Sequence, residues 1–285
     1  MSQLHGFVVI DKPSGITSHD VVAKLRKTLG TKRVGHAGTL DPMATGVLVV
    51  GVNNATKFLQ YITEGKKGYL ATIRLGQSTT TDDKEGDVIN SASPESIRTE
   101  EIKRLLALQV GKVMQVPSKV SAIKINGERA YDLVREGKEV EIPAREVEIY
   151  DLNILEIRKS EFIDIDISVT CSAGTYIRAI ARDLGVQLGV GGHLIALRRN
   201  LVAPFGLADC STLENPHVLP LTEVISKIMP VRQVDLAEIS ELKFGRALQK
   251  SEFSGVGVAV TNAGDVAAII ENREYGAQPL AVFVS

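Results

Sequence analysis

The sequence predicts an α+β fold, in which a mixed, mainly antiparallel sheet with flanking helices is followed by a small β-rich C-terminal domain. Three observations predict it: segments that alternate apolar and polar residues, segments with apolar residues at helical spacing, and a tail that contains only short strand patterns. The chain has 285 residues, of which 44% are hydrophobic and 24% charged, so it can bury one large core and one small one. We therefore divide it into residues 1–230 and 231–285.

The first elements are expected to be a strand, a helix and a second strand. Residues 7–10 form a short apolar strand. Ser18 is suited to cap the helix that follows, because apolar residues then repeat at helical spacing up to Leu29. A glycine-rich loop, 35–46, leads into a strand, 47–52, that is apolar enough to be buried.

The middle of the chain contains the clearest alternation. Residues 68–75 and 163–171 each place apolar side chains on one face, and the second segment has a regular polar face, which is typical of a sheet with one wet side. Helical spacing is found over 99–110 and again over 176–188, where Arg178 lies off the apolar stripe.

The end of the chain is expected to be a linker followed by short strands. Prolines interrupt the stretch 213–230, so we expect a linker there. Strand patterns follow at 257–260, 266–270 and 280–284. These strands are sufficient for a small appended domain.

Charge is distributed unevenly, although the net charge is only −1. Residues 1–80 carry ten Lys or Arg and four Asp or Glu, a net charge of +6, and residues 81–285 carry −7. Five basic residues fall within ten positions without an acid among them: Lys24, Arg26, Lys27, Lys32 and Arg33. Such a cluster is either an ordinary solvated face or a surface that attracts nucleic-acid phosphates.

Several generic sites are excluded by the absence of their motifs. No glycine loop continues into the Gly-Lys-Ser/Thr of a P-loop, and Gly255-Val256-Gly257 lacks the third glycine of a dinucleotide fingerprint, so we expect no nucleotide cofactor. The histidines have no metal-ligand spacing and the two cysteines lie far apart, so we expect no metal and reduced thiols. Without a long apolar run or a signal peptide, we expect no membrane contact and a cytoplasmic protein.

The loop from Arg33 to Gly46 has the clearest chemical character. Its glycines allow a ligand to approach the backbone closely, and Asp41 lies between Leu40 and Pro42, which restrains the chain after the acid. A carboxylate held on such a shaped loop can act in catalysis. On spacing alone it can equally be a turn residue, a role that Asp often has.

Five short motifs occur in a fixed order between about residues 6 and 200. They are Asp11-Lys12-Pro13-Ser14-Gly15-Ile16-Thr17-Ser18, the segment from His36 to Gly46, Ser121-Ala122-Ile123-Lys124, Gly174-Thr175-Tyr176-Ile177-Arg178, and Gly191-Gly192-His193 with Leu197-Arg198-Arg199. In this order they resemble the TruB family, the bacterial tRNA pseudouridine-55 synthases. Two departures accompany the resemblance: the family's proline pair before the third motif is here Val116-Pro117, and the tail resembles the family's small RNA-binding, PUA-like domain only loosely.

The resemblance implies a pseudouridine-synthase fold and three residues that act on the base. It implies that Asp41 is the catalytic aspartate, that Arg178 pairs with it, and that Tyr69 stacks on the target uracil. From pattern alone, Tyr69 can instead be a core residue of its strand and Arg178 a surface arginine of its helix.

The resemblance also implies residues that hold the RNA. It implies that Leu197 lines the base pocket, that His36 contacts the T-loop, and that Tyr176 and Lys124 contribute to RNA binding. The segment 120–148 matches a family loop that closes on RNA. A loop histidine beside glycines can also simply bond to backbone, so the alternative for His36 stays open.

The implied activity is the isomerisation of the uridine at position 55, in the T-loop of tRNA, to pseudouridine. The base must leave its stack, its bond to ribose must break, and C5 must replace N1 on the sugar. No redox change or external atom is involved, so no cofactor is implied. A carboxylate can attack the base or the sugar, or remove a sugar proton, while an arginine keeps it ionised.

Two other functions stay open from the residues. One is a tRNA-folding chaperone for which chemistry is incidental, and the other is a hydrolase that uses Asp41 with a second acid, which no motif supplies. The expected partner is tRNA, with no small-molecule cofactor, and the chain is expected to be a monomer. Because every motif precedes residue 200, the tail is expected to add affinity rather than chemistry.

Overall fold

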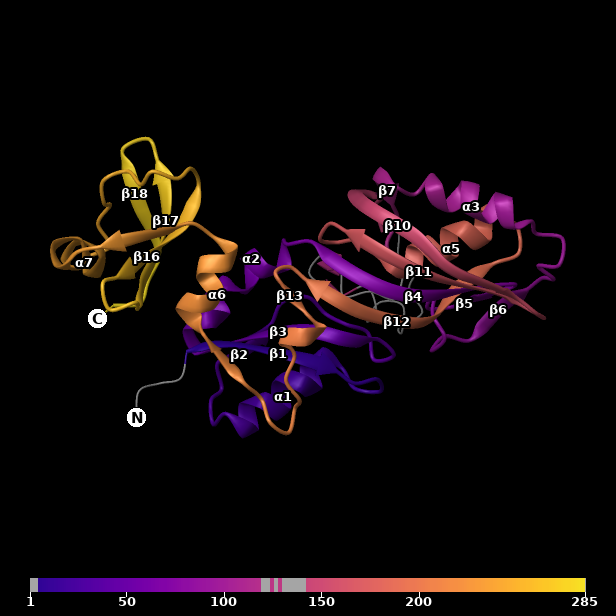
Figure 1. Cartoon of the computed structure of the whole chain (residues 1–285), viewed down its shortest axis with the longest axis horizontal. Coiled ribbons are helices and arrows are strands. Elements are labelled where there is room, and N and C mark those ends of the chain that lie inside the picture. Colours follow the sequence, from indigo (N-terminus) through magenta and orange to yellow (C-terminus); the bar gives the residue numbers. More distant parts are fainter. Residues whose placement is uncertain (1–4, 119–123, 126–127, 130–141, 285) are drawn as a thin grey trace.

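The fold consists of a ten-stranded sheet with helices packed against it and a separate four-stranded sheet (Figure 1). The structure, a computed structural model, describes residues 5–118, 124–125, 128–129 and 142–284. The predicted α+β class, with a mixed, mainly antiparallel sheet and a β-rich C-terminal part, is confirmed. None of the helices in this described part of the chain is both long and apolar enough to cross a membrane.

The large sheet is antiparallel at each pair of neighbours except β3 and β12, which run parallel. In spatial order its strands are β14 (Val218–Pro220), β1 (Gly6–Lys12), β3 (Thr45–Val52), β12 (Gly192–Val202), β4 (Lys67–Leu75), β11 (Ile163–Cys171), β10 (Arg145–Lys159) and β7 (Gly111–Gln115), with β2 (Val34–His36) beside β3 and β13 (Phe205–Gly206) beside β12.

The alternating segments form the centre of this sheet. β4 pairs with β11 on one side and with β12 on the other. Their apolar faces, with Ile73 and Ile165 fully buried, belong to the main core. On the polar face Arg74 pairs with Asp164 at 2.8 Å, so the predicted wet side is occupied by cross-strand ion pairs.

Helices pack against the large sheet, except α7, which packs against the C-terminal sheet, and two short strand pairs lie outside both sheets. The helices are α1 (Ser18–Thr28), α2 (Leu59–Thr63), α3 (Thr99–Ala107), α5 (Ile177–Gln187), α6 (Leu221–Ile228) and α7 (Leu236–Lys243), with single 3₁₀ turns at Asn53–Phe58 and Leu207–Asp209. The short strand pairs are β5 (Gln77–Thr79) with β6 (Val88–Ser91), and β8 (Lys124–Ile125) with β9 (Glu128–Arg129).

The N-cap predicted at Ser18 is wrong by one residue. Thr17 caps α1, because its hydroxyl accepts from the backbone N–H of Asp20 at 3.0 Å while the Asp20 carboxylate accepts from the N–H of Thr17. Ser18 is buried instead and bonds to Leu40 in the loop that carries Asp41. Its role is therefore to join the helix to that loop.

The linker predicted over 213–230 is also wrong. Part of this stretch forms β14, which pairs with β1, and part forms α6. Val224 and Ile225 of α6 are fully buried. Since β14 has three residues and α6 has eight, neither gives a strong periodic signal, and contacts with the rest of the fold decide both.

The C-terminal sheet has the order β15 (Val231–Val234), β16 (Val256–Thr261), β17 (Val266–Arg273) and β18 (Gly276–Val282). Its buried residues fall into two clusters, and one of them, which includes Val234, Leu242 and Ile270, contains only residues of the C-terminal part. The other cluster includes Val258 and Ile269 together with Phe58, which follows β3, and the rings of Phe58 and Phe283 stack at 5.6 Å. The C-terminal sheet is therefore packed onto the first part of the chain.

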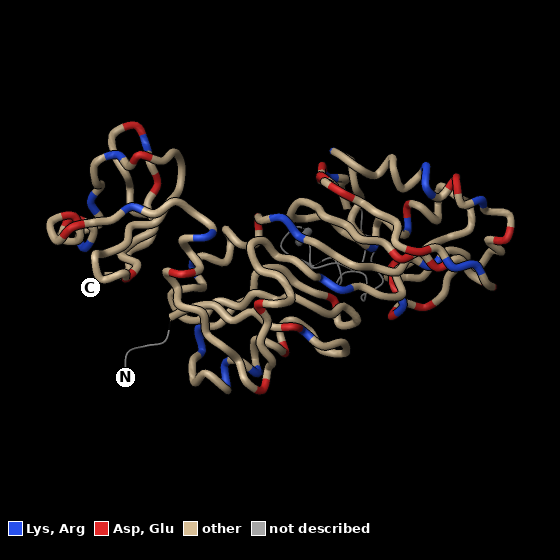
Figure 2. Tube along the Cα trace, in the orientation of Figure 1, with Lys and Arg blue, Asp and Glu red and all other residues tan. Residues whose placement is uncertain are grey.

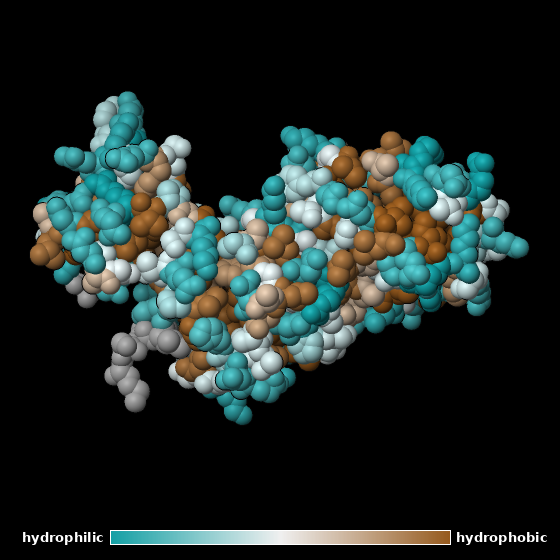
Figure 3. Space-filling model, viewed as in Figure 1, coloured by the Kyte–Doolittle hydropathy of each residue, from teal (hydrophilic) through white to brown (hydrophobic). Residues whose placement is uncertain are grey.

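The described surface includes a basic region and an apolar region. The predicted basic cluster, on α1 and the turn after it, is exposed, and Figure 2 shows basic residues along α1. Apolar side chains are exposed near the β7 edge of the large sheet, where Leu108 and Met114 lie, and Figure 3 shows hydrophobic atoms gathered over that end.

Candidate active site

Asp41 lies on the loop between β2 and β3 and opens into a cavity of about 300 Å³. The cavity is surrounded by this loop, the start of β4, the turn before α5 and the end of β12. Its lining residues are Gly38, Thr39, Leu40, Asp41, Thr63, Lys67, Tyr69, Arg145, Gly174, Thr175, Tyr176, Ile177, Arg178, Leu197 and Arg199. Three of the five motifs read from the sequence therefore meet at one cavity.

Five of the seven predicted site residues line this cavity: Asp41, Tyr69, Tyr176, Arg178 and Leu197. They come from the loop after β2, from β4, from the start of α5 and from β12. The sheet brings the strand residues together because β4 and β12 are neighbours, with Leu197 opposite Ala71.

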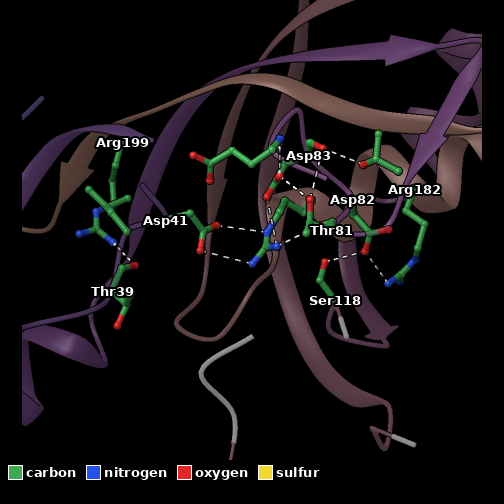
Figure 4. Close-up of polar contacts among 12 residues, drawn as sticks. Thr39, Asp41, Thr81, Asp82, Asp83, Ser118, Arg182 and Arg199 are labelled. Carbon is green, nitrogen blue, oxygen red and sulfur yellow. Dashed lines mark hydrogen bonds and ion pairs between the residues drawn. The ribbon is translucent and has the colours of Figure 1, made fainter. Parts of the chain in front are cut away.

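Arg178 holds the Asp41 carboxylate through two of its nitrogens. Its Nε lies 3.1 Å from Oδ2 of Asp41, and its Nη2 donates to Oδ1 at 3.3 Å (Figure 4). The third nitrogen, Nη1, donates to the carbonyl of Thr81 at 2.8 Å and lies 3.2 Å from Asp83. Because the guanidinium is held on both sides, it fixes the orientation of the carboxylate.

The environment of Asp41 increases its affinity for a proton. Burial raises the pKa of its carboxyl above the usual value, and the Arg178 guanidinium acts in the opposite direction. The negative charge of Asp83 raises this pKa further. The Asp41 side chain is still 33% exposed, so the carboxylate is accessible from the cavity. This is a suitable state for a nucleophile or a general base.

The second acid lies behind Arg178 and not in the cavity. Asp83 is buried, accepts from the Thr81 hydroxyl at 2.6 Å and from the Glu85 N–H at 3.0 Å, and is no part of the cavity wall. Among the described residues that line the cavity, Asp41 is the one acid. The two-carboxylate arrangement that a hydrolase needs is therefore not formed by these side chains.

Tyr69 and Leu197 form the apolar part of the cavity. Both are buried, and both belong to the main core while lining the cavity. The ring therefore packs in the core and also borders the space beside Asp41, while its stacking on the uracil stays a prediction. Burial raises the pKa of its phenol, so the ring is neutral.

Tyr176 is fixed just before α5. Its N–H donates to the side chain of Gln115 at 2.7 Å, and the Gln115 amide donates back to its carbonyl at 3.0 Å. The guanidinium of Arg145 lies 5.0 Å from the ring centre. Arg145 also donates to the carbonyl of Gly174, so this side of the cavity is held by polar contacts.

His36 is not among the described residues that line the cavity. His36 ends β2 and makes an edge-to-face contact with His19 of α1, with ring centres 5.5 Å apart. Burial, together with the charges of His19 and Arg199, lowers the pKa of His36 to about 4, so the ring is neutral. Lys124 lies in β8, where the structure describes the backbone, and most of the predicted loop 120–148 lies outside the described residues.

Two basic residues that received no role from the sequence hold the Asp41 loop. Arg199 is only 1% exposed, and its guanidinium donates to the carbonyls of Gly38 at 3.0 Å and Val47 at 2.8 Å, with a longer contact to the Thr39 carbonyl (Figure 4). Lys12 is fully buried and donates to three carbonyls, one of which is that of Pro42 at 3.3 Å. Burial lowers the pKa of Lys12 to about 8.

Comparison with protein families covers most of the chain. Residues 26–177 match the N-terminal domain of TruB family pseudouridylate synthases. Residues 178–218 match the C-terminal domain of tRNA pseudouridylate synthase B, and residues 229–284 match the C-terminal part of tRNA pseudouridine synthase II.

Comparison with individual proteins also finds tRNA pseudouridine synthases B among the similar sequences. The chain is 52% identical to tRNA pseudouridine synthase B of Corynebacterium diphtheriae over 98% of this chain and 96% of the relative. It is 46% identical to the protein of that name from Thermobifida fusca, over 98% of each chain. A solved Cbf5–Nop10–Gar1 complex contains a chain with the same fold, at a TM-score of 0.71 and 24% identity, over 98% of this chain and 84% of that one.

Proposed function

Since this chain belongs to the TruB family of tRNA pseudouridine synthases, we propose that its substrate is the uridine at position 55, in the T-loop of tRNA. The observation that carries the proposal is the carboxylate of Asp41, held by Arg178 and open to a cavity with one apolar side. A nucleotide flipped out of the T-loop enters such a cavity as a flat base on a ribose.

The five predicted residues that line the cavity each have a role in the proposed reaction. Tyr69 stacks on the uracil and offsets part of the cost of unstacking it, a contact of about 1–3 kcal/mol for each base. Leu197 closes the apolar side, and Tyr176 borders the entrance beside Arg145. Asp41 acts on the base or the sugar while the N1–C1′ bond is exchanged for a C5–C1′ bond, and Arg178 keeps it oriented.

The surface beside the cavity is proposed to bind the rest of the T-arm. The basic cluster of residues 24–33 is exposed on α1 and the following turn, and α1 also carries His19, which contacts His36. The basic cluster therefore lies on the helix that contacts His36, and we propose that RNA phosphates bind along this helix. Lys124 and the 120–148 loop are proposed to contact RNA as well.

The isomerisation adds and removes no atoms, so we propose that it needs no cofactor. We also propose that the enzyme acts as a monomer, with Asp41 and Arg178 of one chain forming the catalytic pair. We place the enzyme in the cytoplasm, where its proposed substrate is, and assign residues 1–230 to the catalytic domain and 231–285 to a small RNA-binding domain.

Replacement of Asp41 by Asn tests the proposal, because it keeps the side-chain size and removes the charge. We expect pseudouridine formation to fall by several orders of magnitude and tRNA affinity to stay within about tenfold. The measurements are tritium release from a T-stem-loop RNA labelled at C5 of uridine, filter binding, and a thermal melt.

The matched control is Asp87→Asn, which makes the same charge change at an exposed position. Substantial turnover by folded Asp41→Asn would contradict the catalytic role and favour the turn interpretation. A chaperone without chemistry would show no difference between the two variants. Wild-type enzyme that releases no tritium from this RNA would contradict the proposed substrate.

A further inference from the structure

Lys67 is a second charged group beside the proposed position of the uracil. It is the first residue of β4, lies 6% exposed, and lines the cavity together with Tyr69. Residues two apart on a strand share a face, so the ammonium of Lys67 and the ring of Tyr69 are on the same side of the sheet. Any base that stacks on Tyr69 therefore comes close to this lysine.

Two of the three N–H donors of the Lys67 ammonium have acceptors within the described residues. Its Nζ donates to the carbonyl of Thr63 at 2.5 Å and to the carbonyl of Gly65 at 3.0 Å, at the end of α2. A lysine ammonium has three N–H donors, and within the described residues two of them have acceptors. One donor is therefore left for a molecule in the cavity.

The charges of the described lining residues favour the binding of an anion in the cavity. Among the described residues, the lining contains four cations, Lys67, Arg145, Arg178 and Arg199, against the carboxylate of Asp41, which already pairs with Arg178. Burial and the charge of Arg199 lower the pKa of Lys67 to about 8, so the ammonium is charged at neutral pH in spite of its surroundings. A buried cation beside another cation is stabilised when a bound anion pairs with it.

We propose that Lys67 donates its remaining N–H to an anionic oxygen of the flipped nucleotide. The inference rests on the proposed function and adds one residue to that site. Two oxygens of the substrate have this chemistry. One belongs to the phosphate beside the target nucleotide, and the other is O2 or O4 of the uracil after its bond to ribose has broken.

The second source follows from the electron balance of the reaction. When the N1–C1′ bond breaks with both electrons on N1, the uracil becomes an anion delocalised over N1, O2 and O4. When C5 then bonds to C1′, the C5 proton leaves and N1 takes up a proton, so the base is neutral again. A fixed ammonium near O2 or O4 stabilises the charge during the interval between these steps.

The test compares Lys67→Met with Lys66→Met, which removes the same charge from the neighbouring, exposed residue. Lys67→Gln is included because its amide still donates to a carbonyl and supports α2. Single-turnover tritium release and RNA affinity are measured for each folded variant. We expect both Lys67 variants to lose about ten- to a hundredfold in rate or affinity, the range for one charge-assisted hydrogen bond, and Lys66→Met to change less than threefold.

An RNA with a neutral methylphosphonate beside the target uridine separates the two sources. If Lys67 contacts the phosphate, RNA affinity falls, and the losses of affinity caused by the methylphosphonate and by Lys67→Gln are not additive. If Lys67 contacts the uracil anion, the single-turnover rate falls at unchanged RNA affinity, and the effects of the methylphosphonate and of Lys67→Gln are additive. Lys67→Gln or Lys67→Met with the rate and affinity of Lys66→Met would overturn the inference, while inactive wild-type enzyme would instead overturn the proposed function.

Discussion

Ser18 offers a direct test of how the catalytic loop is held. Its hydroxyl accepts from the backbone N–H of Leu40 at 2.9 Å and donates to the Leu40 carbonyl at 3.2 Å, and the side chain is almost fully buried. Leu40 directly precedes Asp41. Ser18→Ala removes both hydrogen bonds and leaves two buried backbone groups without these partners.

The expected size of the effect follows from these two bonds. A buried donor or acceptor that loses its partner costs about 1–3 kcal/mol, so for two such groups we expect the free energy of unfolding to fall by about 2–6 kcal/mol. The loop should also shift, and a displacement of about 1 Å at a reacting group can cost on the order of a hundredfold in rate. We expect the single-turnover rate of folded Ser18→Ala to be about ten- to a hundredfold below wild type.

Thr17→Ala is the matched control, because it removes a hydroxyl from the preceding residue. Thr17 caps α1 and is exposed, so its loss should cost about 1 kcal/mol of stability and leave the Asp41 loop in place. Urea unfolding measures the stability of both variants, and tritium release measures their rates under conditions in which both are folded. Equal rates for the two, or a full rate for folded Ser18→Ala, would refute the role of Ser18 in positioning.

Two further substitutions test the cavity. Asp83→Asn should slow single-turnover catalysis more than tenfold at unchanged RNA affinity. It should also move the acid limb of the pH–rate profile to lower pH, because the charge of Asp83 raises the pKa of Asp41. An acid limb at the wild-type pH would contradict this coupling. Tyr69→Phe should keep stacking and stay near the wild-type affinity, whereas Tyr69→Ala should lose about 1–3 kcal/mol of it; equal affinities by filter binding would leave Tyr69 a core residue.

Five of the described residues that line the cavity were predicted, because the family resemblance gives each of them a role. Asp41, Arg178 and Tyr69 lie far apart in the sequence, and the resemblance supplied their association. The residues that support them gave no such signal. Arg199 and Lys67 donate to backbone carbonyls, which every residue possesses, so no partner can be recognised in the sequence.

The errors in the predicted elements have local causes. Thr17 and Ser18 are both suitable caps, and the Asp three residues after Thr17 was the signal that distinguishes them. The short strand β14 forms by pairing with β1, which a linear pattern does not show. The sequence also does not show that Val258 and Ile269 share an apolar cluster with Phe58, because that association depends on tertiary packing.

Both ends of the catalytic loop are bound to a single residue of the sheet. Gly38 has a φ of +92°, and a Cβ there would lie 3.5 Å from Nη1 of Arg199. Gly46 has a φ of +102°, and a Cβ there would lie 2.1 Å from the carbonyl oxygen of Arg199, so only glycine fits against the parallel strand. The loop is thus fixed to β12, which also carries Leu197, and Asp41 is held against the apolar wall with the rigidity of the sheet rather than the mobility of a loop.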